Sequence, residues 1–232
     1  MADFQWAVLA QMAIEGGEMN YFKTLVWPGG GVIGLILWGM SIVTLGIMIQ
    51  FFITIRRSTL MPDLVRQQIQ GLFDNKQYRE AIEVTASEPS LLSHVVHASL
   101  SEAAHGFSAM ERAMEEAAED KTTGMLRKVE WLNLMGNVSP MLGLLGTVWG
   151  MIMAFMEIVK AKGIPPADKL AYSIGIALVT TLLGLSVAIP ALAALAVLRN
   201  RIDALSNEVV LVAEELIAVF RPSAKGASSA QA

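Results

Sequence analysis

The chain has 232 residues, 54% of them hydrophobic, and a formal net charge of −4. This composition is too apolar for an average soluble domain and predicts membrane-spanning segments. The small negative charge does not indicate a nucleic-acid partner, and the lack of cysteine excludes disulfides, thiolate metal sites and cysteine nucleophiles.

Three uncharged stretches are long enough to cross a membrane. They lie at 32–55, 134–156 and 170–198. About 20 helical residues are needed to cross roughly 30 Å of hydrocarbon. A single stretch of this kind could be a buried core helix, but three in one chain favour an all-α integral membrane protein with three transmembrane helices.

The distribution of basic residues predicts the orientation. Nine Lys and Arg lie between the first two stretches and four follow the third. The N-terminal segment 1–31 has one, and the loop 157–169 has three. Because basic residues concentrate on the cytoplasmic side, the N-terminus is expected in the periplasm and the C-terminus in the cytoplasm. Residues 4–14 are interpreted as an amphipathic helix that lies on the periplasmic face of the membrane that the chain spans.

The region 56–133 is mostly polar and is predicted to form a cytoplasmic helical domain. Asp74 and Asn75 form a turn pair, and Gly106 is a helix breaker. The expected short helices lie at 61–73, at 76–87 and from 90 to about 105.

Both later membrane stretches are expected to continue into the cytoplasm as helices. The motif SAME at 108–111 is an S-x-x-E capping box with Ser108 as the N-cap, and no breaker follows before the stretch 134–156. After the third stretch, apolar residues in alternating steps of three and four predict a cytoplasmic helix at 199–221. The Ser- and Ala-rich tail 222–232 is predicted to be disordered.

No pattern of catalytic or metal-binding residues is found. His94 and His97 could share a metal, but no nearby ligand completes the set, so they are interpreted as ordinary histidines. The sequence lacks a nucleophile–base pair, a phosphate-binding loop and a zinc motif. We therefore expect no enzyme activity, no metal and no cofactor.

Small residues repeat along one face of each of the two later membrane stretches. Those of the second are Gly143, Thr147, Gly150 and Ala154, with Gly146 beside them. Those of the third are Ser173, Ala177, Thr181, Gly184, Ala188 and Ala191. Small residues at helical spacing let membrane helices approach closely, which predicts that the glycines are packing positions.

Hydroxyl groups lie among these small residues near mid-membrane. Thr147 is in the second stretch, and Thr180 and Thr181 lie at a comparable depth in the third. A membrane threonine can donate a hydrogen bond to its own helix, so helix packing alone can accommodate it. The alternative is that Thr147, Thr180 and Thr181, together with Ser173, line a narrow polar path for a cation. The spacing leaves both interpretations open.

Two motifs resemble the signature pair of the ExbB/TolQ/MotA proton-channel family. They are SPMLGLLGTVWGMIMAF at 139–155 and ALVTTLLGLSVAIPAL at 177–192. The resemblance extends to the three-span arrangement, to the large helical loop and to DNKQYREAIE at 74–83. In having three spans rather than four, the chain resembles ExbB and TolQ and differs from the flagellar MotA branch.

This resemblance implies a subunit of an ion-driven motor in the bacterial inner membrane. It implies a homopentamer that surrounds a dimer of an ExbD/TolR-type single-span partner and passes force to TonB-like or Tol/Pal-like envelope components. The second and third spans would line the pore. By position, Thr147 and Thr181 match the family's pore threonines. Pro190 matches the proline of the third-span motif and is expected at a helix-packing position.

One position departs from the family pattern. Ile176 stands where ExbB and TolQ carry a glutamate, and none of the three stretches contains an acidic residue. Because an intramembrane carboxylate is the expected proton carrier or cation ligand, it should come from the partner's single span, as an aspartate. Oxygen ligands also suit Na⁺, so the ion is either H⁺ or Na⁺.

Two other functions are compatible with parts of the sequence. A membrane scaffold could keep the pentameric fold and lack conduction, with Ile176 as the sign of that loss. A secondary transporter is the weaker alternative, because the sequence has no inverted repeats and no broken mid-span helices.

Overall fold

The computed structural model describes residues 31–161 and 166–221. The predicted interfacial helix at 4–14 and the predicted disordered tail 222–232 lie outside the described residues. Every regular element in the described ranges is a helix, with no strand among them. The predicted all-α fold is therefore confirmed.

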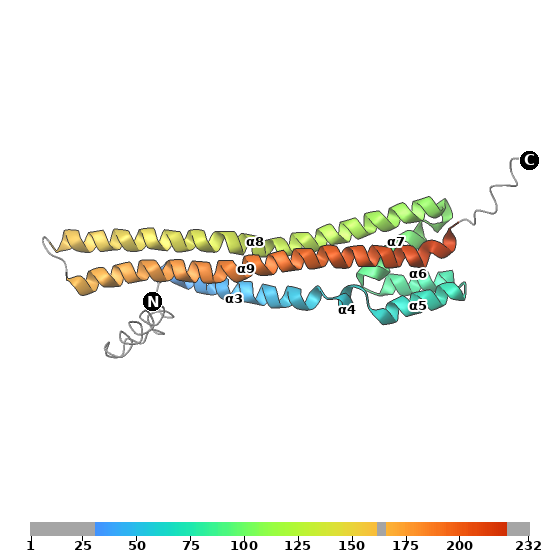
Figure 1. The fold of residues 1–232 in the computed structure, drawn as a ribbon, viewed down its shortest axis with the longest axis horizontal. Coiled ribbons are helices and arrows are strands. Elements are labelled where there is room, and N and C mark those ends of the chain that lie inside the picture. The colour runs from blue at the N-terminus through green and yellow to red at the C-terminus, as the bar shows by residue number, and fades with distance from the viewer. Residues whose placement is uncertain (1–30, 162–165, 222–232) are drawn as a thin grey trace, which may run out of the picture. The chain divides into compact units, whose positions relative to one another are not determined.

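Three of the described helices are long and apolar enough to cross a membrane. They are α3 (Gly31–Thr54), α8 (Phe107–Lys160) and α9 (Ala167–Ile217), drawn in blue, green to yellow, and orange to red in Figure 1. Helices α8 and α9 have 54 and 51 residues, more than twice the length that a membrane requires. Each therefore continues well beyond its apolar stretch.

Short helices occupy most of the chain between α3 and α8. They are α4 (Arg57–Leu60), α5 (Asp63–Asp74), α6 (Tyr78–Ser87) and α7 (Leu91–Ser101), followed by a 3₁₀ turn at Ala103–His105. Helix α4 was not expected, because four residues are too few to show a helical period. Helix α7 begins after Ser90, whose hydroxyl accepts a hydrogen bond from the Ser93 amide at 3.1 Å.

The predicted start of α8 is wrong by two residues. Ser108 was expected to be the N-cap, but α8 begins at Phe107 and Ser108 lies inside its first turn. The Gly106 carbonyl accepts the hydrogen bonds of the Ala109 and Met110 amides, at 3.1 and 3.2 Å. Gly106 has a φ of +96°, a conformation open to glycine, so the chain turns into the helix here.

The described residues form two compact units. The first contains 31–45 and 135–191, and the second contains 46–134 and 192–221. Each of the long helices α3, α8 and α9 contributes to both units.

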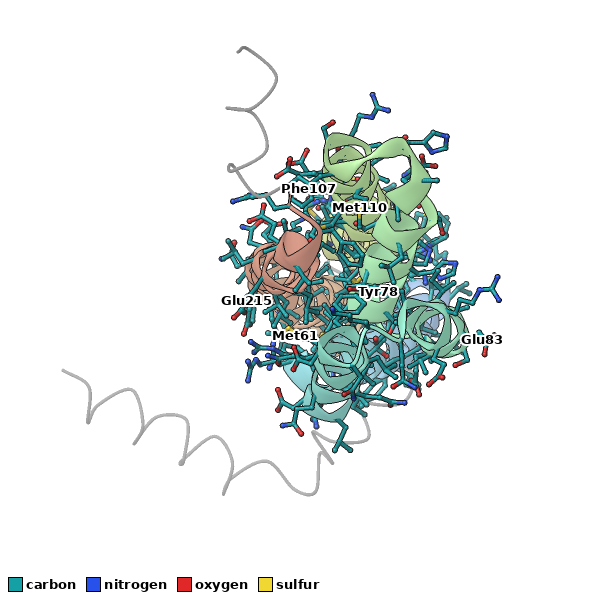
Figure 2. All side chains as sticks on the ribbon, turned by 90° about the vertical axis from the view of Figure 1, so that its right-hand side faces the viewer. Met61, Tyr78, Glu83, Phe107, Met110 and Glu215 are labelled. Atoms are coloured by element: carbon teal, nitrogen blue, oxygen red, sulfur yellow. The ribbon has the colours of Figure 1, made fainter. Side chains whose placement is uncertain are left out.

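The second unit contains a hydrophobic core built from α5, α6, α7 and the adjoining parts of α3, α8 and α9. Figure 2 shows Tyr78 toward the middle of this unit and Glu83 and Glu215 at its rim. The core members without solvent exposure include Ile69, Leu92, Met114, Leu132 and Ile202.

Three aromatic rings, those of Phe73, Tyr78 and Phe220, pack together in this core. The ring centroids of Phe73 and Phe220 lie 5.6 Å apart, and those of Tyr78 and Phe220 lie 4.9 Å apart. Phe73 is 2% exposed, and Phe220 belongs to the 3₁₀ turn Ala218–Phe220 that follows α9. Edge-to-face and tilted ring pairs of this kind add to the free energy gained by burial.

Truncating the Phe73 side chain should destabilise the second unit. We expect Phe73→Ala to lower its free energy of unfolding by about 3–5 kcal/mol, because the lost ring leaves a cavity in a packed core. Hydrogen exchange on the full chain measures this as faster exchange of the α5 and α6 amides. Leu64→Ala is the control on the same helix, since Leu64 is 80% exposed. Equal exchange in the two variants would contradict the predicted role of Phe73.

Candidate functional site

Helices α8 and α9 lie side by side in the first unit, with backbones in close contact (Figure 1). A Cβ atom added to Gly184 would lie 2.6 Å from the Ser139 carbonyl oxygen. One added to Gly143 would lie 3.0 Å from the Thr180 carbonyl oxygen and 3.1 Å from the Thr181 Cα. Glycine at both positions therefore permits the two helix backbones to approach this closely.

Two further glycines of α8, Gly146 and Gly150, lie against side chains of α9. A Cβ atom on Gly146 would lie 2.3 Å from the Thr180 Oγ1, and one on Gly150 would lie 2.7 Å from the Ala177 Cβ. These distances are too short for any real side chain. The four glycines thus form a continuous contact surface between the helices, which we call the glycine seam (Gly143, Gly146, Gly150 and Gly184).

Thr180 lies inside the glycine seam. Its side chain has no solvent exposure. Its hydroxyl donates to the Ala177 carbonyl at 2.8 Å in its own helix and lies 3.4 Å from the Gly143 carbonyl oxygen of α8. This geometry gives Thr180 a packing role between the helices, and its expected part in an ion pathway stays a prediction.

Thr147 and Thr181 are both half-buried. The Thr147 hydroxyl donates to the Leu144 carbonyl at 2.6 Å, and the Thr181 hydroxyl donates to the Gly143 carbonyl at 3.3 Å. Each hydroxyl proton is therefore directed to the backbone. The lone pairs of both oxygens remain able to accept a hydrogen bond or to bind a cation.

Two serines extend the row of hydroxyls. Ser173 is 8% exposed and donates to the Lys169 carbonyl at 3.2 Å. Ser139 is fully buried and donates to the Met135 carbonyl at 2.6 Å. Sequence reasoning missed Ser139, although it lies one helical turn before Gly143 and so continues the stripe of small residues.

A proline interrupts each helix without ending it. Pro190 lies inside α9 and is exposed, and Pro140 lies inside α8. Because proline lacks an amide proton, each one leaves a carbonyl four residues earlier without its usual helical partner. Pro190 was expected from the third-span motif, but Pro140 was not singled out, although it too is a proline within an apolar stretch.

The membrane-depth parts of α8 and α9 carry hydroxyls without carboxylates. Ile176 is half-buried. Glu130 is the last acidic residue of α8 before its uncharged stretch 134–156. Asn133 donates to Glu130 at 2.5 Å, and Arg199 pairs with the same carboxylate. The Asn133 hydrogen bond and the Arg199 guanidinium lower the pKa of Glu130, so this carboxylate is held in its charged form.

The histidines of the second unit do not gather further ligands. No group of three or more His, Cys, Asp or Glu is placed to hold a metal within the described ranges. The His97 Nδ1 lies 3.3 Å from the Thr85 hydroxyl. Burial, followed by the charges of Lys121 and His97, lowers the pKa of His94.

The sequence profile of the MotA/TolQ/ExbB proton channel family matches residues 85–210, more than half of the chain. The chain belongs to this family. The match includes all of α8, most of α9, the glycine seam and all of the hydroxyls described above. The family resemblance predicted from the two motifs is thereby confirmed.

Individual members of the family match over parts of their length. The chain is similar to the Tol-Pal system protein TolQ of Haemophilus influenzae, with 34% identity over 115 residues, or 50% of each chain. It is 39% identical to the biopolymer transport protein ExbB of Xanthomonas campestris pv. campestris over 82 residues, which is 35% of this chain and 32% of that protein. A putative ExbB homolog of Methanothermobacter thermautotrophicus is 32% identical over 152 residues, or 63% and 53%. The chain thus spans between about a third and about half the length of these curated relatives.

Membership of the MotA/TolQ/ExbB family, together with three apolar helices, identifies a membrane protein of a transport family. The family is one of channels and not of enzymes. The relatives that match are named as TolQ and ExbB proteins, in agreement with the prediction of that branch.

Proposed function

We propose that this chain is the ion-conducting subunit of an ExbB/TolQ-like motor in the bacterial inner membrane. Its N-terminus would be periplasmic and its C-terminus cytoplasmic, as the distribution of basic residues predicts. It acts without catalysis and without a cofactor. The observation that carries the proposal is the pair of half-buried hydroxyls, Thr147 and Thr181, on two helices packed along the glycine seam.

The chemistry of these hydroxyls suits a cation in transit. Both hydroxyl protons are directed to backbone carbonyls, at 2.6 and 3.3 Å, so the oxygen atoms present lone pairs. A neutral oxygen lowers the cost of moving a cation through hydrocarbon and does not trap it as a charged ligand would. H⁺ and Na⁺ both fit this description.

Among the described residues of one copy, the side chains that carry the two hydroxyls are partly open. Thr147 and Thr181 are only half-buried, and large apolar residues of α8 such as Leu144 and Val148 are exposed. Further copies of the chain would cover these side chains and close a pore around the hydroxyls. We therefore propose a homo-oligomer, with the pentamer of the ExbB/TolQ resemblance as the expected state, embedded in membrane lipid.

The ion-carrying carboxylate is proposed to come from a partner. Ile176 and its neighbours in α9 provide no acidic group at membrane depth. A single-span protein of the ExbD/TolR type, with an intramembrane aspartate, would supply it inside the pore. The names of the relatives, a Tol-Pal system protein and a biopolymer transport protein, support an onward connection to Tol/Pal-like or TonB-like envelope components.

A non-conducting scaffold of the same fold is the second candidate. Ile176 favours it, because an apolar side chain there removes the chain's own ion-binding group. The two candidates differ in whether the oligomer with its partner carries ions.

Ion flux in proteoliposomes distinguishes the two functions. The chain is co-expressed with the single-span protein that co-purifies with it, and both are reconstituted together. We expect flux under a proton gradient or a sodium gradient, because the partner's aspartate completes the path. Replacement of Na⁺ by K⁺ identifies the ion. Absence of flux under both gradients, with the complex intact, would support the scaffold.

The partner's carboxylate provides the matched control for this experiment. A complex in which the intramembrane aspartate of the partner is changed to asparagine should assemble and carry no ions. Flux that persists in that complex would contradict the proposed origin of the carboxylate.

A further inference from the structure

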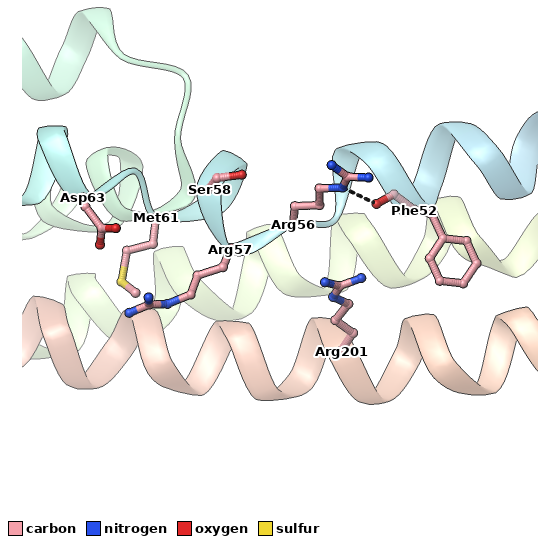
Figure 3. A pocket seen from close by; sticks show the side chains of 7 residues that line it. All are labelled: Phe52, Arg56, Arg57, Ser58, Met61, Asp63 and Arg201. Atoms are coloured by element: carbon pink, nitrogen blue, oxygen red, sulfur yellow. Dashed lines mark hydrogen bonds between the residues drawn. The ribbon is translucent and has the colours of Figure 1, made fainter.

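A basic pocket lies in the second unit where α3 ends. It is a cavity of about 560 Å³ between the link from α3 to α4, the start of α5 and the facing side of α9. Figure 3 shows Arg56 and Arg201 on opposite sides of this pocket, with Phe52 beside them. Neither the ion pathway nor the glycine seam includes any of these residues.

Positive charge exceeds negative charge in the pocket. Three arginines line it, with Asp63 as the acidic residue of the lining. Arg57 forms an ion pair with Glu208 at 2.9 Å. Among the described residues Arg201 has no carboxylate partner, and the Arg56 Nε donates only to the Phe52 carbonyl, at 3.2 Å. Two guanidinium groups that form no ion pair therefore line one cavity, together with the single carboxylate of Asp63.

The pocket lies at the ends of two apolar membrane stretches, where lipid headgroups are expected. Phe52 belongs to the last turn of the uncharged helix α3, and Arg56 is the first charged residue after it. Arg201 follows the uncharged stretch 170–198 by three residues. The first charged residues after apolar membrane stretches lie at the level of the headgroups. Basic pockets between membrane helices at this level bind anionic lipid headgroups.

We propose that this pocket binds the phosphate of an anionic phospholipid. The guanidinium groups of Arg56 and Arg201 would each donate to the phosphate oxygens, a geometry that planar guanidinium groups favour. The acyl chains would leave the pocket past Phe52, along the apolar surface of α3. The Asp63 carboxylate repels a phosphate and thus limits the affinity.

Native mass spectrometry of the full chain, released from nanodiscs of phosphatidylcholine with phosphatidylglycerol, tests the proposal. Wild-type protein should retain phosphatidylglycerol. Each arginine near a headgroup contributes about fivefold in affinity, so Arg56→Gln with Arg201→Gln should weaken retention about 25-fold. Asp63→Asn should strengthen retention, because it removes a repulsive charge from the pocket.

Arg79→Gln is the matched control, since Arg79 is an exposed arginine of α6 outside the pocket. It should retain phosphatidylglycerol like the wild type. Size-exclusion chromatography of each variant checks that the oligomer is intact. Retention by the double variant equal to that of Arg79→Gln would overturn the proposal. Displacement of the lipid by millimolar inorganic phosphate would also overturn it, because the pocket would then be a site for a soluble anion.

Discussion

Changing both Thr147 and Thr181 to valine should abolish ion flux through the reconstituted complex and leave its assembly intact. Valine has nearly the shape of threonine, so the substitution removes two oxygen atoms and little volume. A polar or charged group left without a partner in an apolar environment costs about 1–3 kcal/mol, so the loss of each oxygen should slow the passage of the ion roughly tenfold or more. Proteoliposome flux and size-exclusion chromatography measure the two outcomes separately.

Thr180→Val is the control for this experiment. It is the same substitution one residue away, at a side chain buried in the contact between α8 and α9. We expect it to retain ion flux. Full flux in the double valine variant would contradict the pore-lining role of Thr147 and Thr181. Loss of flux in an intact Thr180→Val complex would show that the ion path includes the glycine seam.

Gly184→Ala should separate α8 from α9 and destabilise the first unit. The new Cβ atom would lie 2.6 Å from the Ser139 carbonyl oxygen, and a backbone atom cannot turn aside as a flexible side chain can. Overpacking of this kind costs about 1–3 kcal/mol. The measurement is the thermal unfolding of the complex in detergent, where we expect a lower Tm and loss of the oligomer at lower temperature.

Gly175→Ala is the matched control on the same helix. A Cβ atom at Gly175 meets no atom within 4 Å, so the alanine has room. Alanine favours helix more than glycine does, so the Tm should be unchanged or slightly higher. Equal Tm values for Gly184→Ala and Gly175→Ala would contradict the close backbone contact at Gly184.

The sequence predicted the long helices and the small residues of α8 and α9 because both depend on local composition. An apolar stretch of more than 20 residues has few alternatives to a membrane helix, and small residues recur at the helical period. These signals are independent of tertiary packing. The all-α fold followed from them, whereas the family assignment came from the resemblance of the two motifs at 139–155 and 177–192.

The sequence did not predict details that depend on neighbouring atoms. The capping box at Ser108 was a sound local pattern, but Gly106 reached a φ of +96° and started α8 earlier. The four residues of α4 were too short for periodicity to register.

The threonine pair shows a similar limit. Sequence spacing assigned Thr181 to the stripe and placed Thr180 about 100° away. In the structure the hydroxyl oxygens of Thr180 and Thr181 lie 3.4 and 3.3 Å from the Gly143 carbonyl oxygen, and Thr180 is the more deeply buried of the two. Gly146 leaves room for the Thr180 side chain, and Gly143 lets the backbone of Thr180 and Thr181 come close. The face that α9 turns toward α8 depends on the space that the α8 glycines leave. The helical period of α9 alone carries no information about that space.

The absence of carboxylates at membrane depth has a consequence for stoichiometry. If each copy of the chain carried its own glutamate at the position of Ile176, the number of titrating groups would equal the number of copies in the ring. With isoleucine there, only the partner's aspartates would titrate. In the proposed complex, the number of ions moved per mechanical cycle would then depend on the number of partner aspartates and not on the number of copies of this chain.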